Sequence, residues 1–126
     1  MSANSPSTLT VNLVSVWRDD SLAGVALAER EDSSGWNLVF ERSFVFTDAD
    51  RKAGQDTYCI TNEAGVAVYG GVAGWAIAGP ELLLTLDAKT SAALGLASQL
   101  TISLVCPSDS VEELRGALEE ILAPTR

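Results

Sequence analysis

Apolar and polar residues alternate along much of this chain with the period of two that is typical of β-strands. The pattern begins over residues 8–17, but its phase slips at Leu13-Val14. Before that point the odd positions are apolar, and after it the even positions are. A slip of this kind predicts either a β-bulge or a change of neighbouring strand.

Residues 22–30 predict a second strand, which follows a turn at Arg18-Asp19-Asp20-Ser21. One face of this strand carries only small residues, Gly24, Ala26 and Ala28. A close-packed protein leaves no void above such a face. We therefore expect a large group to pack there, either Trp17, Trp36 or the last helix.

Alternation and turn residues predict the remaining strands. Glycine and asparagine at Asn62-Glu63-Ala64-Gly65 indicate a hairpin, Gly70-Gly71 indicates a bend, and Gly79-Pro80 indicates a tight turn. The strongly apolar run from Glu81 to Leu86 predicts a strand that is covered on both faces. The strands expected after residue 30 cover residues 36–41, 56–61, 66–70, 72–78, 81–86 and 100–106.

Three segments have the end signals of helices. Thr47 with Asp50 forms a capping-box pattern, and Gly54 indicates the end of a helix of one or two turns. Asp87 is placed to cap a helix over residues 88–94 that Gly95 ends. Ser110 with Glu113 predicts a capping box for the C-terminal helix. The apolar stripe of that helix consists of Val111, Leu114, Leu118, Ile121 and Leu122.

The order of these elements is strands, a short helix, more strands and a closing helix, with no regular βαβ alternation. It predicts an α+β fold: a curved, mostly antiparallel β-sheet with one or two short helices and a C-terminal helix packed on the sheet. The 126 residues fit a disordered lead over residues 1–7 and a single domain over residues 8–126. No signal peptide or membrane-spanning run is recognised, so a cytoplasmic protein is expected.

The chain is acidic, with 17 Asp and Glu, 8 Lys and Arg, and a net charge of −9. Nucleic-acid binding depends on Lys and Arg, so the balance argues against it. An acidic surface favours a cationic partner, although charge also serves solubility. If the two acidic turns lay at one end of the first hairpin, they would form an anionic patch; solvated loop charges are the favoured alternative. The residues in question are Asp19, Asp20, Glu29, Glu31 and Asp32.

The sequence carries none of the common catalytic or metal-binding patterns. The chain has no histidine, which excludes Ser-His-Asp and Cys-His catalysis. Cys59 and Cys106 lie in apolar runs, as small buried hydrophobes do, and no disulfide is expected. The glycines of residues 70–74 lack the lysine of a phosphate-binding loop. We expect no enzyme activity and no cofactor, and we single out Trp75, among glycines and alanines, as an exposed aromatic partner anchor.

Several segments taken in order resemble the immunity protein 10 family of bacterial polymorphic toxin systems. They include residues 41–44, the acidic residues 48–50, residues 54–58, residues 69–72, Leu82 to Leu86, residues 92–96 and the acidic C-terminal helix. The resemblance implies a cytoplasmic protein that binds and blocks its cognate toxin domain, often a basic nuclease, without chemistry. It also implies fold-defining roles for Asp56, Tyr58, Tyr69, Gly70 and Gly71.

Two other hypotheses stay open. A small-ligand-binding domain would have an apolar pocket between a curved sheet and the C-terminal helix. A carboxylate hydrolase using Asp19 and Glu31 would need both groups together in a cleft. An edge strand of the sheet also makes a second copy of the chain, in a homodimer, a candidate partner.

Overall fold

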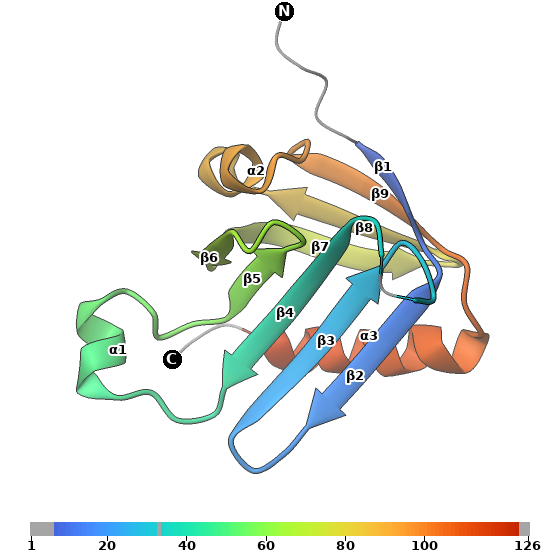
Figure 1. The fold of residues 1–126 in the computed structure, drawn as a ribbon. Coiled ribbons are helices and arrows are strands. Elements are labelled where there is room, and N and C mark those ends of the chain that lie inside the picture. Colours follow the sequence, from blue (N-terminus) through green and yellow to red (C-terminus); the bar gives the residue numbers. More distant parts are fainter. Residues whose placement is uncertain (1–6, 33, 124–126) are drawn as a thin grey trace, which may run out of the picture.

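The structure is a computed structural model, and it describes residues 7–32 and 34–123. The described residues form nine strands and three helices, which confirms the predicted α+β class (Figure 1). The strands are β1 (Thr8–Val11), β2 (Leu13–Arg18), β3 (Leu22–Ala28), β4 (Asn37–Ser43), β5 (Cys59–Asn62), β6 (Ala67–Tyr69), β7 (Val72–Ala78), β8 (Glu81–Leu86) and β9 (Gln99–Leu104). The helices are α1 (Asp48–Lys52), α2 (Ala88–Leu94) and α3 (Ser108–Ile121).

The strands are divided between two sheets. Sheet A has the order β1-β9-β8-β7, and sheet B has the order β2-β3-β4-β5-β6. All neighbours pair antiparallel except β1 and β9, which are parallel. The fold is therefore mostly antiparallel, as the sequence predicted, but its strands form two layers that share one core.

The phase slip near residue 13 marks the point where the chain passes from sheet A to sheet B. β1 ends at Val11, and β2 begins at Leu13 beside β3. Asn12 lies between them and donates its backbone N–H to the carbonyl of Ala28 at 3.0 Å. The predicted change of neighbour is confirmed, because alternation must restart when a strand joins a second sheet.

The chain returns to sheet A at Gly70-Gly71, between β6 and β7. Both glycines have positive φ angles, 74° and 101°. A Cβ atom on Gly71 would lie 1.9 Å from Oγ1 of Thr90, so no side chain fits there. The buried Tyr58 stabilises the crossing, because its carbonyl accepts from Gly70 N and its hydroxyl accepts from Val72 N.

The core lies between the two sheets and α3. The helix packs on the inner face of β2, β3 and β4 (Figure 1). Its predicted apolar stripe is confirmed: Leu114, Leu118 and Ile121 are fully buried, and Val111 and Leu122 pack beside them.

The prediction that β8 is covered on both faces is wrong. Leu82, Leu84 and Leu86 are buried in the core, whereas Leu83 is 41% exposed on the outer face of sheet A. β8 pairs with antiparallel neighbours, and an antiparallel sheet needs cover on one face only.

The helix ends follow the predicted signals in two of the three cases. Thr47 and Asp50 form both hydrogen bonds of the capping box of α1. Asp87 accepts the backbone N–H of Thr90 at the start of α2, and Gly95 ends that helix in the left-handed conformation. The capping box predicted at Ser110 is wrong, since the N-cap of α3 is Pro107, three residues earlier, and forms no side-chain cap hydrogen bond.

The N-terminal prediction covers residues 1–7, of which residues 1–6 lie outside the described residues. The carbonyl of Ser7 accepts the backbone N–H of Thr101 at 2.9 Å, so Ser7 already pairs with sheet A. Within the described ranges, no helix combines the length and the hydropathy that crossing a membrane would require.

Candidate partner-binding face

Sheet B has one face packed on the core and one face turned away from it. Side chains alternate between the two faces, and residues paired across strands share a face. We name the face opposite the core the open face. By register its strand residues are Leu13, Ser15, Trp17, Leu22, Gly24, Ala26, Ala28, Asn37, Val39, Glu41, Ser43, Cys59, Thr61, Ala67 and Tyr69.

The open face is mostly apolar and carries little cover. Its Leu22, Val39 and Cys59 are half-buried, and Tyr69 is 45% exposed. None of these four residues packs against the core cluster. Their inner-face neighbours Val25, Phe40 and Ile60, in contrast, are completely buried. An uncovered apolar sheet face is a feature that marks interaction surfaces.

The small residues of β3 are explained by Trp17. Trp17 pairs directly with Gly24, and a Cβ atom on Gly24 would lie 2.3 Å from the indole ring. The ring therefore occupies the space that a side chain at position 24 would need. This confirms that a large residue packs on the small face, and it identifies Trp17 among the three predicted candidates.

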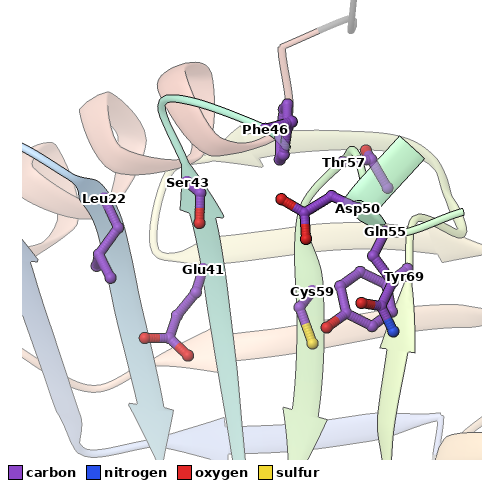
Figure 2. Close-up of a pocket in the computed structure, with 9 residues that line it drawn as sticks. All are labelled: Leu22, Glu41, Ser43, Phe46, Asp50, Gln55, Thr57, Cys59 and Tyr69. Atoms are coloured by element: carbon purple, nitrogen blue, oxygen red, sulfur yellow. The ribbon is translucent and has the colours of Figure 1, made fainter. Parts of the chain in front are cut away.

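A pocket of about 230 Å³ opens at one end of the open face (Figure 2). Four strands supply one part of its wall, and the segment between β4 and β5, which contains α1, supplies the other. The residues that line it are Leu22, Glu41, Ser43, Phe46, Asp50, Gln55, Thr57, Cys59 and Tyr69. Figure 2 shows side chains from both parts gathered on the same side of the sheet.

The pocket is negatively charged. Glu41 is the charged side chain among the strand residues of the open face, and it forms no ion pair within the described part of the chain. Asp50 has a structural duty, since its Oδ2 accepts the backbone N–H of Thr47 at 2.8 Å. Partial burial raises the pKa of Tyr69, and the nearby Cys59 and Asp50 raise it further. Tyr69 therefore stays a neutral hydroxyl that can donate or accept.

The two acidic turns do not lie at one end of the first hairpin, so the anionic patch that depended on this condition is not formed. Asp19 and Asp20 lie in the β2–β3 turn, whereas Glu29, Glu31 and Asp32 follow the other end of β3. The seven residues of β3 separate these turns by about 20 Å, at a strand rise of roughly 3.3 Å per residue. A strand connects turns at its opposite ends, so the two turns cannot merge.

Three of the five carboxylates stabilise their own loops. Asp19 accepts hydrogen bonds from the backbone N–H of Ser21, the hydroxyl of Ser21 and the backbone N–H of Leu22. The bond from the backbone N–H of Ser21 does most to lower the pKa of Asp19. Asp32 accepts from the hydroxyl and N–H of Ser34, and the hydroxyl bond does most to lower its pKa.

Glu29 completes the set, because its Oε1 accepts the N–H of Trp36 at 3.2 Å. Asp20 and Glu31 are exposed. Asp19 and Glu31 lie at opposite ends of β3, so the geometry does not provide the two-carboxylate cleft that the hydrolase hypothesis required.

Trp75, which the sequence singled out as exposed, is half-buried and packs against the core. It pairs with the buried Leu84 and so faces inward from β7. Asp56 is half-buried in the loop before β5. Tyr69, inferred to be fold-defining, projects from the open face and lines its pocket.

Sequence reasoning missed the open face itself, together with Leu22, Val39 and Glu41. A signal was present in β3, which reads Leu-Ala-Gly-Val-Ala-Leu-Ala. A strand that is apolar at every position needs cover on both faces or exposes an apolar one.

No group of three or more His, Cys, Asp or Glu side chains that could hold a metal ion occurs within residues 7–32 and 34–123. Cys59 and Cys106 are both half-buried free thiols. They are less buried than we expected from the apolar residues around them in the sequence.

These features define an α+β protein in which one apolar sheet face lies outside the core, beside a small acidic pocket. The sequence model of the family described as immunity protein 10 matches residues 10–112. The chain therefore belongs to the immunity protein 10 family. Comparisons with curated proteins and with solved structures give no significant match.

Proposed function

We propose that this protein is an immunity protein that neutralises the cognate toxin domain of its polymorphic toxin system by binding it directly through the open face. Membership of the immunity protein 10 family is the observation that carries the proposal. A protein of this kind acts by occupying a surface of the toxin, so it needs a contact area and no catalytic group.

The open face has the character of such a contact area. It combines an aromatic residue that is 45% exposed, Tyr69, with half-buried Val39 and Leu22. Aromatic side chains with an apolar body and a polar tip dominate the energetics of many interfaces. Glu41 and Asp50 give the pocket end of the face a negative charge, which suits a cationic surface on the toxin.

The net charge of −9 supports the same choice of partner. Opposite charge speeds association, and the effect weakens as salt rises. A toxin with a basic active-site surface, such as a nuclease, is the class of partner that fits this charge. The protein then acts where its toxin is produced, and we infer a cytoplasmic location from that role.

Co-expression tests the proposal directly. The toxin domain encoded beside this gene is expressed in bacteria with and without the protein, and survival is measured. Survival that depends on the protein, with salt-sensitive binding of the two purified partners, is expected. Killing that is equal with and without the protein would refute the proposal.

A matched pair of variants tests the face. Tyr69→Ala removes an exposed side chain from the open face, and Leu83→Ala removes a side chain of similar exposure from the outer face of sheet A. We expect Tyr69→Ala to weaken toxin binding by about 30-fold, the effect of losing roughly 2 kcal/mol at an aromatic anchor. Leu83→Ala is expected to bind as wild type. Equal affinities for the two variants would place the interface elsewhere.

The ligand-binding alternative has less support. It called for an apolar pocket closed by the C-terminal helix, but the stripe of α3 packs directly on sheet B, with Leu114 and Leu118 fully buried. The pocket of the open face is polar in its lining and open to solvent.

A further inference from the structure

The four sheet edges of this fold are not equally protected. An edge strand offers unpaired N–H and C=O groups to any extended chain, and proteins blunt such edges with short strands, bulges, prolines or charges. β1 has four residues, β6 has three, and the register of β7 is interrupted between Val72 and Gly74. β2 is different: it pairs with β3 without interruption over six residues and contains no proline.

The hydrogen-bond pattern shows which groups of β2 are free. Asp19 donates its N–H to the carbonyl of Leu22, which makes their pair a hydrogen-bonded one. Such pairs alternate along an antiparallel ladder. Leu13, Ser15 and Trp17 are therefore bonded to β3.

The other three residues of β2 are Val14, Val16 and Arg18. Their backbone N–H and C=O groups point away from β3, toward the unpaired edge of sheet B. The pairing of β3 with β4 agrees with this pattern. Phe44 donates its N–H to the carbonyl of Ser21, and Glu29 donates its N–H to that of Trp36, so the odd-numbered residues of β3 hydrogen-bond to β4 and the even-numbered ones to β2. No hydrogen bond of the outward groups of β2 to the described residues is formed.

A groove of about 310 Å³ runs beside this edge, between β2 and α3. In Figure 1 α3 passes behind β2, which it contacts, and extends beyond it, so the helix forms a floor under any strand added there. Val16, which is 37% exposed, and Ala117 supply apolar surface. Three carboxylates and one guanidinium also line the groove: Glu112, Glu113, Glu120 and Arg18.

The charge of the groove decides between two occupants. A second copy of the chain, paired through its own β2, would bring the Glu112 and Glu113 side chains of both copies together, because a two-fold interface sets a surface against itself. A strand of another protein that carries Lys or Arg would instead neutralise these carboxylates. Arg18 is paired with Glu120 at 3.1 Å and Arg115 with Glu112 at 3.5 Å, so Glu113 is the groove carboxylate that forms no ion pair with the described residues and keeps the groove negative.

We infer that β2 is a docking edge, and that an extended, basic segment of the toxin domain pairs with it as an additional strand of sheet B. This inference rests on the proposed function. The added strand hydrogen-bonds to Val14, Val16 and Arg18, and it lays its inward side chains over the N-terminal half of α3. Its outward side chains continue the open face, so one partner engages the face and the edge together.

Amide hydrogen exchange, resolved by residue, tests the pairing without any mutation. In the free protein the amides of Ser15 and Trp17 are protected by β3, and those of Val14, Val16 and Arg18 exchange rapidly. In the complex with the toxin domain encoded beside this gene, the second set is expected to become protected as well. Rapid exchange of all three in the complex would overturn the inference.

A proline variant gives an independent readout. Val16→Pro removes an outward N–H, as edge strands tolerate. We expect it to weaken toxin binding by about tenfold or more, since one hydrogen bond to the added strand is lost and the proline ring also obstructs pairing.

Two controls accompany it. Val16→Thr keeps the N–H and the branched side chain and is expected to bind as wild type. The carbonyls of Ser7 and Val11 face β9, so the odd-numbered residues of β1 pair with β9 and the N–H of Thr10 points outward. Thr10→Pro removes this outward N–H from the β1 edge and is also expected to bind as wild type.

The outcomes separate the two proposals. If wild-type protein does not bind the toxin, the proposed function fails. Thermal unfolding first establishes that Val16→Pro is folded. If the wild-type protein and this variant then bind the toxin equally well, only the docking edge is wrong. If the wild-type protein is a dimer in solution and Val16→Pro is a monomer, the edge serves a second copy, which overturns the choice of occupant.

Discussion

Replacing Gly71 with alanine is expected to destabilise the protein severely. Gly71 has a φ of 101°, which lies outside the conformations that an L-residue adopts readily. Backbone strain of this kind costs about 1–3 kcal/mol. The new Cβ would also lie 1.9 Å from Oγ1 and 2.7 Å from Cβ of Thr90.

The clash has no cheap relief, because Thr90 is only 4% exposed and lies on α2. Overpacking a filled site costs a further 1–3 kcal/mol, roughly. We expect Gly71→Ala to lower the free energy of unfolding by about 3 kcal/mol or more. Unfolding in urea, followed by tryptophan fluorescence, measures this change.

Two further variants separate the causes. Gly79→Ala also places alanine at a positive φ, 59°, but its Cβ would meet no atom within 4 Å, so a loss of only about 1–2 kcal/mol is expected. Adding Thr90→Ala to Gly71→Ala removes part of the clash, and the double variant should be more stable than the sum of the single losses. A Gly71→Ala protein no less stable than Gly79→Ala would refute the reasoning.

Two other predictions concern the same part of the fold. The hydrogen bond from the N–H of Thr90 lowers the pKa of Asp87 below its ordinary value of 3.8, so the bond stabilises the protein above about pH 4 and is lost as the pH falls through the folded pKa. Acid unfolding curves of Asp87→Ala should therefore fall less steeply below pH 4 than those of wild type, and parallel curves would contradict this. Tyr58→Phe removes the acceptor that binds the N–H of Val72 at 2.8 Å, and a loss of about 1 kcal/mol in urea unfolding is expected; an unchanged midpoint would show that solvent replaces the bond.

Local signals in the sequence predicted local structure well. Thr47 and Asp87 cap their helices as expected, because a cap depends on a side chain and on backbone groups two or three residues away. The slip at Leu13-Val14 was also informative, since a strand that changes sheets must reset its alternation. Ser110 misled because Ser108 and Pro107 already start the helix one turn earlier.

The candidate site was harder to predict, because it depends on which sheet face remains uncovered. Alternation assigns Val39 and Phe40 to opposite faces, but both are apolar, and only the packing of sheet A and α3 shows which one is inside. Whether acidic residues such as Asp20 and Glu31 form one patch depends on which turns the fold brings together, and the fold places these two residues at opposite ends of β3. Trp75 was expected to be exposed because its neighbours in the sequence are small. Those neighbours lie on the outer face of β7, whereas Trp75 lies on the inner face beside Leu84.

The parallel pairing of β1 with β9 has a consequence for how the chain folds as it is synthesised. Thr8 pairs with Thr101 and Val11 with Leu104, so β1 cannot pair until β9, about 90 residues later in the chain, has been synthesised. Sheet B, built from hairpins between consecutive strands, can assemble early from local contacts. Leu9 and Val11 therefore stay unpaired until β9 is made, and the pairing of β1 with β9 then completes sheet A.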